Sequence, residues 1–188
     1  MNPLLLDIPE EIESERLLLR APRAGDGPLV NASVRESFNE LRRWMPWAQE
    51  IPTVEESEEF ARRGRVKFLS REDLPFLIFL KNTSTHIGNM GLHDIDWNVP
   101  AFEIGYWLHS ARYGRGYMTE AVGTITSFAF TTLDAARVQI RMDGNNQRSY
   151  RVAERAGFQF ESVRRCDARG VTGALRDTRV YVKTTSPN

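Results

Sequence analysis

The sequence is poor in the features that mark secreted, membrane-bound or nucleic-acid-binding proteins. It contains one cysteine, Cys166, so no intrachain disulfide can form, which suits a reducing compartment. Its 25 lysines and arginines are balanced by 25 aspartates and glutamates, so no net charge attracts nucleic acid or an anionic membrane surface. The longest apolar run, Pro75 to Leu80, is far shorter than the roughly 20 residues that span a bilayer. The opening MNPLLLDIPEE has neither a basic start nor a long apolar stretch, unlike a signal peptide. We therefore expect a cytoplasmic protein with no nucleic-acid or membrane partner.

Several catalytic motifs are missing as well. The histidines His86, His93 and His109 show neither H-x-H nor H-E-x-x-H spacing, so no metal site is expected. There is no G-x-S-x-G nucleophile elbow. Cys166 follows two arginines but has no recognisable base partner, so we expect a strand or surface cysteine and not a nucleophile.

What is present is an alternation of strand and helix patterns without repeats. With 188 residues, the chain is long enough for one compact core and too short for two. We expect a single domain over residues 1–188, with its core at about 14–184. Residues 16–20 (RLLLR) have a short strand pattern. Further on, segments rich in β-formers are separated by turn-like NTST and NVP, and they predict three consecutive antiparallel strands at 75–81, 86–97 and 101–108.

Helix signals lie on both sides of these strands. Asp26 is the expected N-cap of a helix with Pro28 in its first turn, and Thr53 with Glu56 forms a capping-box pattern that opens a second helix. A third helix is predicted by apolar residues that recur at steps of three and four, namely Met118, Ala121, Val122, Ile125, Phe128, Ala129 and Leu133.

The order of elements after residue 100 predicts the fold class. The third helix lies between the strand at 101–108 and a strand at 137–142, and this order implies a right-handed crossover with parallel outer strands. A short helix then stops at Gly157, and residues 158–165 and 174–184 form a closing antiparallel pair. We expect an α+β fold with a mixed, mostly antiparallel sheet, one parallel strand pair and flanking helices.

The stretch ARYGRGYMTEAV, residues 111–122, places two glycines directly before the third helix. Free amides at a helix N-terminus bind anions, and Gly114 and Gly116 lack side chains that would hold a phosphate away. Arg112 and Arg115 add positive charge at the same point. A plain turn with solvated arginines is the alternative.

Two other nucleotide-binding motifs do not match this stretch. No Gly-Lys-Ser/Thr triplet follows Gly114, which argues against a Walker loop. The dinucleotide fingerprint G-x-G-x-x-G has Thr119 in place of its third glycine. Asp143 lies later than the usual ribose-binding acid, and no second βαβ half is present.

Three segments, GYWLHSARYGRGYMTEA, NNQRSYRVAERAGF and IGNMGLHDID, resemble the GNAT superfamily of acyl-CoA N-acyltransferases, and in particular its RimJ/RimL-type branch of ribosomal-protein N-terminal acetyltransferases. The resemblance runs from Arg16 to about Tyr181. Gly114 and Gly116 match the family's Q/R-x-x-G-x-G/A loop, although Ala111 replaces the usual first residue. The later motifs N-x-x-S-x-R and A-G-F match at Asn146, Ser149, Arg151 and at Ala156 to Phe158.

The resemblance implies how acetyl-CoA binds. The strands AFEIGYWL and RVQIRM would splay apart and admit the pantetheine arm between them, with one amide near Leu108 facing the thioester oxygen. The residues that the family pattern assigns to the cofactor are Tyr106, Trp107, Leu108, Arg112, Tyr113, Gly114, Arg115, Gly116, Tyr117, Asn146, Ser149 and Arg151.

The resemblance also implies candidate catalytic and acceptor-binding residues. Glu103 matches the glutamate of the family's A-E-I-G-Y-W-L and is the candidate base, acting through a water; the alternatives are a solvent-facing glutamate or one that binds a substrate cation. Ser149 is the candidate general acid, because the tyrosine that many relatives carry is replaced by Ala153; water is the alternative. Trp44 and Trp47 would wall the acceptor pocket, or would only anchor a helix to the core.

The implied reaction is acetyl transfer from acetyl-CoA to a primary amine, without a metal. A protein or peptide N-terminal α-amine is the expected acceptor, since its reference pKa is near 8 whereas that of lysine is near 10.4. Two alternatives stay open: a small amine such as a polyamine, an amino sugar or an amino-acid derivative, and a non-catalytic acyl-CoA-binding module. The oligomeric state is expected to be monomer or homodimer.

Overall fold

A mixed sheet of eight strands runs through the protein in the order β1-β2-β3-β4-β5-β6-β8-β7. The computed structural model describes residues 2–185; Met1 and residues 186–188, which the single-domain prediction includes, lie outside them. The strands are β1 Glu11–Glu13, β2 Leu17–Arg20, β3 Leu74–Leu80, β4 His86–Asp96, β5 Ala101–Leu108, β6 Arg137–Asp143, β7 Gln159–Arg169 and β8 Leu175–Thr184. The helices are α1 Gly27–Leu41, α2 Val54–Ser70, α3 Tyr117–Thr132 and α4 Gln147–Arg155, with short 3-10 turns η1 Pro3–Leu5 and η2 Ser110–Arg112.

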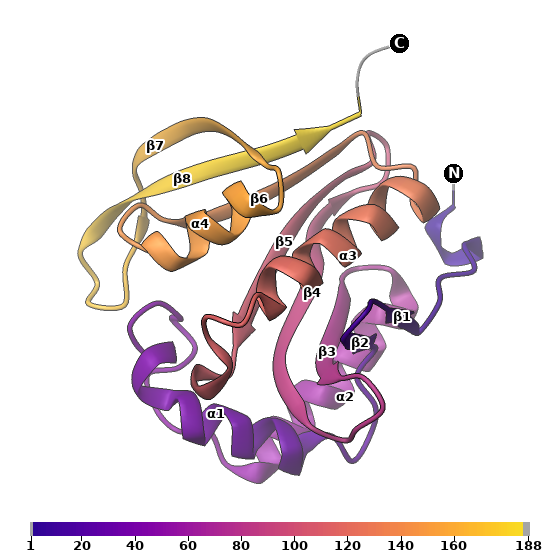
Figure 1. Ribbon diagram of the computed structural model, residues 1–188, viewed down its shortest axis with the longest axis vertical. Helices are drawn as coiled ribbons and strands as arrows, with labels where there is room; N and C mark the ends of the chain where they lie inside the picture. Colours follow the sequence, from indigo (N-terminus) through magenta and orange to yellow (C-terminus); the bar gives the residue numbers. More distant parts are fainter. Residues whose placement is uncertain (1, 186–188) are drawn as a thin grey trace.

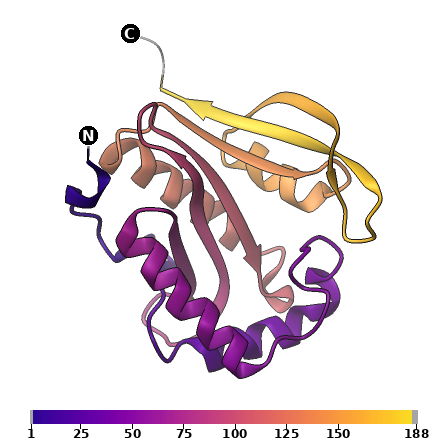
Figure 2. The same cartoon turned by 180° about the vertical axis from the view of Figure 1, so that it is seen from behind.

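The helices cover opposite faces of the sheet. Helices α3 and α4 lie on the face toward the viewer in Figure 1, and α1 and α2 lie on the face toward the viewer in Figure 2. The predicted apolar face of α3 is buried at Met118, Ala121, Val122, Ile125, Phe128 and Ala129. It packs against side chains of the central strands, including Phe76, Phe102 and Ile104. Burial of this face fixes α3, and with it the glycine-rich loop at its N-terminus.

One strand pair is parallel, as predicted from the crossover. The pairing of β5 with β6 joins Ala101 to Arg137, Phe102 to Val138 and Glu103 to Gln139. Both strands continue beyond these pairs, but there β6 follows its antiparallel partner β8 as far as Asp143, and β5 diverges from it (Figure 1). The remaining strand pairs are antiparallel. The α+β class and the splayed parallel pair are therefore confirmed.

Most local predictions hold, with two corrections. The capping box is present, since the Thr53 side chain accepts from the Glu56 amide and the Glu56 side chain accepts from the Thr53 amide. Asp26 occupies the N-cap position of α1, but its side chain makes no capping bond; the carboxylate instead accepts from the Arg20 guanidinium and the Arg23 amide. Strand β1 was not predicted, because its short EIE segment has too few residues for a pattern.

The length and composition of the helices bear on the expected lack of a membrane-spanning segment. Among residues 2–185, every helix falls short of the length and apolar character that crossing a bilayer requires.

Candidate active site

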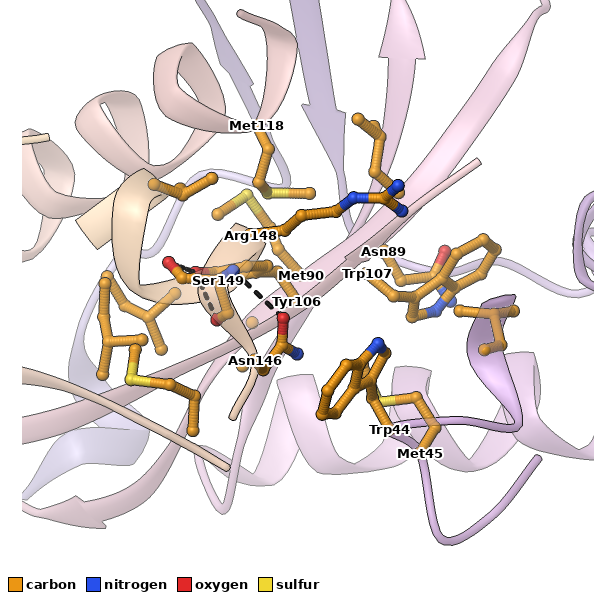
Figure 3. Close-up of a pocket in the computed structure, with 18 of the residues that line it drawn as sticks. Trp44, Met45, Asn89, Met90, Tyr106, Trp107, Met118, Asn146, Arg148 and Ser149 are labelled. Carbon is orange, nitrogen blue, oxygen red and sulfur yellow. Dashed lines mark hydrogen bonds between the residues drawn. The ribbon is translucent and has the colours of Figure 1, made fainter. Parts of the chain in front are cut away.

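A cavity of about 1290 Å³ lies where β5 and β6 separate. Residues from α1, α2, β4, β5, β6, α4 and the glycine-rich loop line it. In Figure 3, Trp44, Trp107 and Asn89 lie on one side of the cavity. Asn146 and Ser149, at the start of α4, lie on the other side. The cavity therefore reaches both faces of the sheet, which would allow two molecules to meet from opposite sides.

The glycine-rich loop presents bare backbone to the cavity. Gly114 and Gly116 both have positive φ, 75° and 79°, a conformation that glycine adopts without strain. A Cβ built at Gly114 would have no atom within 4 Å, so the loop is open on that side. Gly116 is the N-cap of α3 and has no side chain that could cap the helix. The first amides of α3 therefore remain free for an anion.

Arg16 and Glu120 hold this loop in place, a role that the sequence did not reveal. The Glu120 carboxylate accepts from Ser14 Oγ at 2.7 Å and from the Arg16 amide at 2.8 Å. It also forms an ion pair with the Arg16 guanidinium, 2.6 Å between Nη2 and Oε2. The same guanidinium donates to the carbonyl of Arg115 at 3.1 Å and lies over the Tyr117 ring. The N-terminal strand segment thus supports the loop from behind.

The second half of β5 offers main-chain groups to the gap. The amide of His109, the residue after β5, donates to Ile87 on the β4 side. Successive amides of a strand point to alternate sides, so those of Leu108 and Tyr106 point toward the gap left by β6. Both residues line the cavity together with Trp107. An extended chain in this gap would add to β5 as a strand does.

The start of α4 brings Asn146, Ser149 and Tyr106 together. The Asn146 side chain caps α4 by accepting from the Ser149 amide, which leaves its own NH₂ group available to a ligand. Ser149 Oγ lies 3.0 Å from Tyr106 Oη, and Oη also donates to the Ser149 carbonyl at 3.1 Å. Burial raises the pKa of Tyr106 to about 12, so its hydroxyl stays protonated. A tyrosine hydroxyl thus contacts Ser149 from β5.

The other predicted cofactor residues fall into two groups. Arg112, Tyr113, Tyr117 and Arg151 line the cavity. Arg115 is exposed beside it, and its part in the loop is the carbonyl that Arg16 holds.

Glu103 lies on the opposite face of the sheet from Ser149 and is buried, with 8% of its surface exposed. Its Oε2 accepts from Gln139 Nε2 at 2.9 Å and lies 3.4 Å from Arg141 Nη1. Its Oε1 is 3.9 Å from His93 Nε2. The alternative that the Glu103 side chain simply points to solvent is therefore wrong.

Three cross-strand pairs form the floor of the cavity on this face. Asn89 pairs with Trp107, Gly91 with Gly105, and His93 with Glu103. All six line the cavity, because alternate residues of a strand share one face. Trp44 and Trp47 line the same part; Trp47 is 52% exposed, and its ring lies 6.3 Å from that of Trp107.

The histidines have separate environments. His93, Asp94 and Glu103 place ligand atoms within 4.8 Å of one another, a grouping from two strands that sequence spacing could not indicate. The Arg141 guanidinium, 3.4 Å from Glu103 and 3.9 Å from Asp94, already supplies positive charge there. His86 is buried between Ser33 and Asn89, whereas the partly buried His109 contacts the exposed Glu36. Cys166 is exposed on β7, as expected of a surface cysteine.

Comparison with known sequences identifies relatives of the whole arrangement. A family model described as acetyltransferase (GNAT) domain matches residues 16–159. The chain is 31% identical over 152 residues to the probable N-acetyltransferase YjcK of Bacillus subtilis (strain 168), covering 80% of each chain. It is 25% identical over 145 residues to the ribosomal-protein-serine acetyltransferase of Escherichia coli (strain K12), covering 76% of this chain and 80% of the relative.

Solved structures agree with the fold. RimL, a ribosomal L7/L12 alpha-N-protein acetyltransferase in complex with coenzyme A, superposes with a TM-score of 0.87 at 24% identity, covering 95% of this chain and 100% of that one. The microcin C7 self-immunity acetyltransferase MccE, in complex with acetyl-CoA and AMP, gives a TM-score of 0.86 at 22% identity, covering 95% and 98%. With the matched domain, the splayed strands and the glycine loop before α3 in agreement, the chain belongs to the GNAT acetyltransferase family and is an N-acetyltransferase.

Proposed function

We propose that the protein transfers acetyl from acetyl-CoA directly to the N-terminal α-amine of a protein or peptide. The observation that carries this proposal is the cavity that joins the two faces of the sheet at the splay. On the α3 side it has free amides and arginines for a diphosphate. On the α1 side it has a floor of bare backbone at Gly91 and Gly105, with the buried carboxylate of Glu103 beside it.

On the cofactor side, the amides of residues 112–117 bind the diphosphate and the gap-facing amides of β5 bind the pantetheine arm. Asn146 contributes its NH₂ group to the arm or to the adjoining phosphates, and Arg151 adds charge at the rim. The thioester then lies in the gap beyond the last β5–β6 pair at Glu103, along the stretch from Gly105 to Leu108 that carries the gap-facing amides of Tyr106 and Leu108. A single amide aimed at the developing oxyanion stabilises such a transition state by roughly 3 kcal/mol.

The reaction requires a neutral amine and a proton for the leaving thiolate. The ammonium form of the amine gives up one proton toward Glu103, and the neutral nitrogen attacks the carbonyl carbon. The tetrahedral intermediate then loses a second proton from nitrogen to solvent as its carbon–sulfur bond breaks. Ser149 Oγ donates its proton to the thiolate and is reprotonated from solvent; the Tyr106 hydroxyl, 3.0 Å away, positions it. This pair supplies the acid that Ala153 lacks, which favours an enzyme over a non-catalytic acyl-CoA-binding module.

The acceptor side suits a peptide terminus. Trp44, Trp47 and Trp107 form an apolar wall, and the exposed edge of Trp47 leaves room for a chain that continues outward. Relatives with the same fold include a ribosomal-protein-serine acetyltransferase at 25% identity. The second candidate is a small amine with a planar group, favoured by the same tryptophan wall and by the AMP bound to MccE.

The test is thiol release from acetyl-CoA with a panel of peptides, polyamines, amino sugars and aminoacyl compounds. We expect a peptide to give the highest kcat/KM, Gly116→Trp to abolish turnover by filling the diphosphate site, and Glu103→Gln to reduce it at least about tenfold. Mass spectrometry of co-expressed proteins should find an acetylated N-terminus that disappears with Glu103→Gln. Cofactor binding without turnover on any acceptor would instead support the binding module.

A further inference from the structure

The imidazole of His93 lies where the amine must approach. A Cβ built at Gly105 would be 2.7 Å from His93 Nε2, so the ring rests on the bare backbone of Gly105. Gly105 is the first residue on this face of β5 beyond the last β5–β6 pair, Glu103 with Gln139. An amine that reaches a thioester in the gap from the α1 side therefore passes beside Nε2.

Glu103 is less accessible to the amine than His93. Two donors, Gln139 and Arg141, contact its Oε2, and its Oε1 faces the His93 ring. The His93 side chain is 38% exposed, whereas that of Glu103 is 10% exposed. The imidazole is thus the more accessible of the two groups in the cavity lining.

The charged groups around His93 come from several strands. Asp94 is its neighbour on β4 and Glu103 faces it from β5. Arg141 of β6 lies 3.4 Å from Glu103 and 3.9 Å from Asp94, and Asp167 of β7 lies 4.0 Å from Arg141. Two carboxylates therefore adjoin the imidazole, and Arg141 partly neutralises them.

We propose that His93 is the catalytic base of the acetyl transfer and that Glu103 is its positioning residue. This inference rests on the proposed amine-acetylating function and specifies its first step. The ammonium form of the acceptor transfers one proton to the lone pair of His93 Nε2, and its nitrogen lone pair then forms the bond to the acetyl carbon. As the carbon–sulfur bond breaks, the nitrogen loses its second proton to solvent and the thiolate takes the proton of Ser149. The imidazolium faces Glu103 Oε1 and releases its proton to solvent through the exposed ring edge. No other reactant is required.

The test compares His93→Gln, His93→Ala and Glu103→Gln with the wild-type enzyme on its best amine. Loss of a general base lowers rates by about 10²–10⁴-fold, so we expect kcat of His93→Gln to fall at least about 100-fold while calorimetry gives an unchanged acetyl-CoA affinity. Imidazole added to His93→Ala should restore turnover in proportion to its concentration, which a purely structural role would not allow. Acceptors whose amines are largely unprotonated at neutral pH should lose much less activity than strongly basic ones.

Gly105→Ala provides a second route to the same effect, because its Cβ displaces the ring while the imidazole remains in the protein. We expect its kcat to fall with that of His93→Gln. If His93→Gln keeps kcat within twofold while Glu103→Gln loses more than tenfold, Glu103 is the base and the inference is wrong although the proposed function stands. Activity that a chelator removes and a divalent ion restores would also overturn it, in favour of a cation held by His93, Asp94 and Glu103. A wild-type enzyme inactive on every amine would overturn the proposed function itself.

Discussion

Arg148 and Glu40 form an ion pair that joins α4 to the end of α1, with 2.9 Å between Nη1 and Oε2. Both residues line the cavity. Arg148 also stacks over the Tyr113 ring at 5.0 Å, and Figure 3 shows its side chain extending away from α4. The pair therefore bridges α4, on the cofactor side of the cavity, and α1, on the acceptor side. We expect it to act as a latch that opens when a bulky ligand enters or leaves between the two helices.

Breaking this pair should change ligand exchange more than stability. An exposed ion pair contributes at most about 1 kcal/mol, so Glu40→Gln should leave the melting temperature nearly unchanged. We expect coenzyme A to dissociate at least about threefold faster, because changes to a binding site act mainly on the dissociation rate. Stopped-flow displacement measures this rate. Arg43→Gln is the matched control, since Arg43 contacts the same Glu40 at 3.8 Å but lies off the cavity lining; equal rates for the two variants would contradict the proposed latch.

Ser149 and Tyr106 should behave as one unit. Ser149→Ala and Tyr106→Phe each remove one hydroxyl of the 3.0 Å pair, and we expect each to lower kcat by about 10- to 100-fold. The double variant should be little worse than either single one, because residues in one hydrogen-bonded network are not additive. Steady-state thiol release measures the three rates. Tyr150→Phe is the control, as Tyr150 stacks on Tyr181, and it should remain within twofold of wild type. Fully additive losses would argue for independent roles.

Coenzyme A should bind the glycine-rich loop less tightly when the support of the loop by Arg16 and Glu120 is removed. In Glu120→Gln the ion pair to Arg16 is lost, and Arg16 then holds the Arg115 carbonyl less firmly. We expect the dissociation constant of coenzyme A to rise about five- to tenfold, as for loss of a charge-assisted hydrogen bond of roughly 1 kcal/mol or more. Isothermal calorimetry measures it. Glu58→Gln serves as the control, because Glu58 similarly accepts from loop amides of Gly25 and Gly27 but lies outside the cavity.

The pH dependence of this support has a defined sign. Burial alone would raise the pKa of Glu120, but hydrogen bonds from Ser14 and Arg16 outweigh it, and the pKa is lowered. A carboxyl with a lowered pKa stabilises the folded state fully above its unfolded pKa and loses this contribution as pH falls through the folded one. Wild-type stability should therefore decline in acid more steeply than that of Glu120→Gln. If the free energies of unfolding of wild type and Glu120→Gln differed by the same amount at every pH, the role given to Glu120 would be contradicted.

Local patterns predicted the elements of this fold because their causes are local. The capping box at Thr53 and the apolar face of α3 each depend on residues within a few positions, and both are present. The support of the glycine loop was missed because Arg16 and Glu120 lie 104 residues apart. Nothing in either segment indicates that β2 runs beside the start of α3.

In the active site, too, contacts that depend on strand register and on helix packing could not be predicted from the sequence. Glu103 and Ser149 were predicted from a family motif, but the pairing of His93 with Glu103 depends on strand register, which a sequence does not specify by itself. The register shifts directly after His93, where Asp94 adopts a positive φ of 49°. His93 is thus the last residue of the regular β4–β5 pairing on the cavity face. Likewise, Tyr106 was expected to act through its main chain, and its hydroxyl contact with Ser149 emerged only from the packing of α4 on β5.

His86 should make the enzyme sensitive to mild acid. Its ring contacts Ser33 Oγ at 2.8 Å and Asn89 Oδ1 at 2.7 Å, and burial lowers its pKa to about 4. The unfolded chain binds a proton near pH 6.5, so the unfolded state gains protons first as pH falls. The contribution of His86 to the free energy of unfolding should not change with pH above about pH 6.5. Between there and pH 4 it should lower the free energy of unfolding by roughly 3 kcal/mol in total.

Urea denaturation between pH 7 and pH 4.5 measures this dependence in the wild type and in His86→Gln. The variant should be less stable at pH 7, because it loses the contacts to Ser33 and Asn89, yet its stability should change less with pH over this window. Since Asn89 lines the cavity opposite Trp107, His86→Gln should also raise the acceptor KM while the acetyl-CoA affinity stays unchanged. An identical slope in wild type and His86→Gln would show that another group titrates, and an unchanged acceptor KM would show that the buried ring does not orient Asn89 toward the substrate.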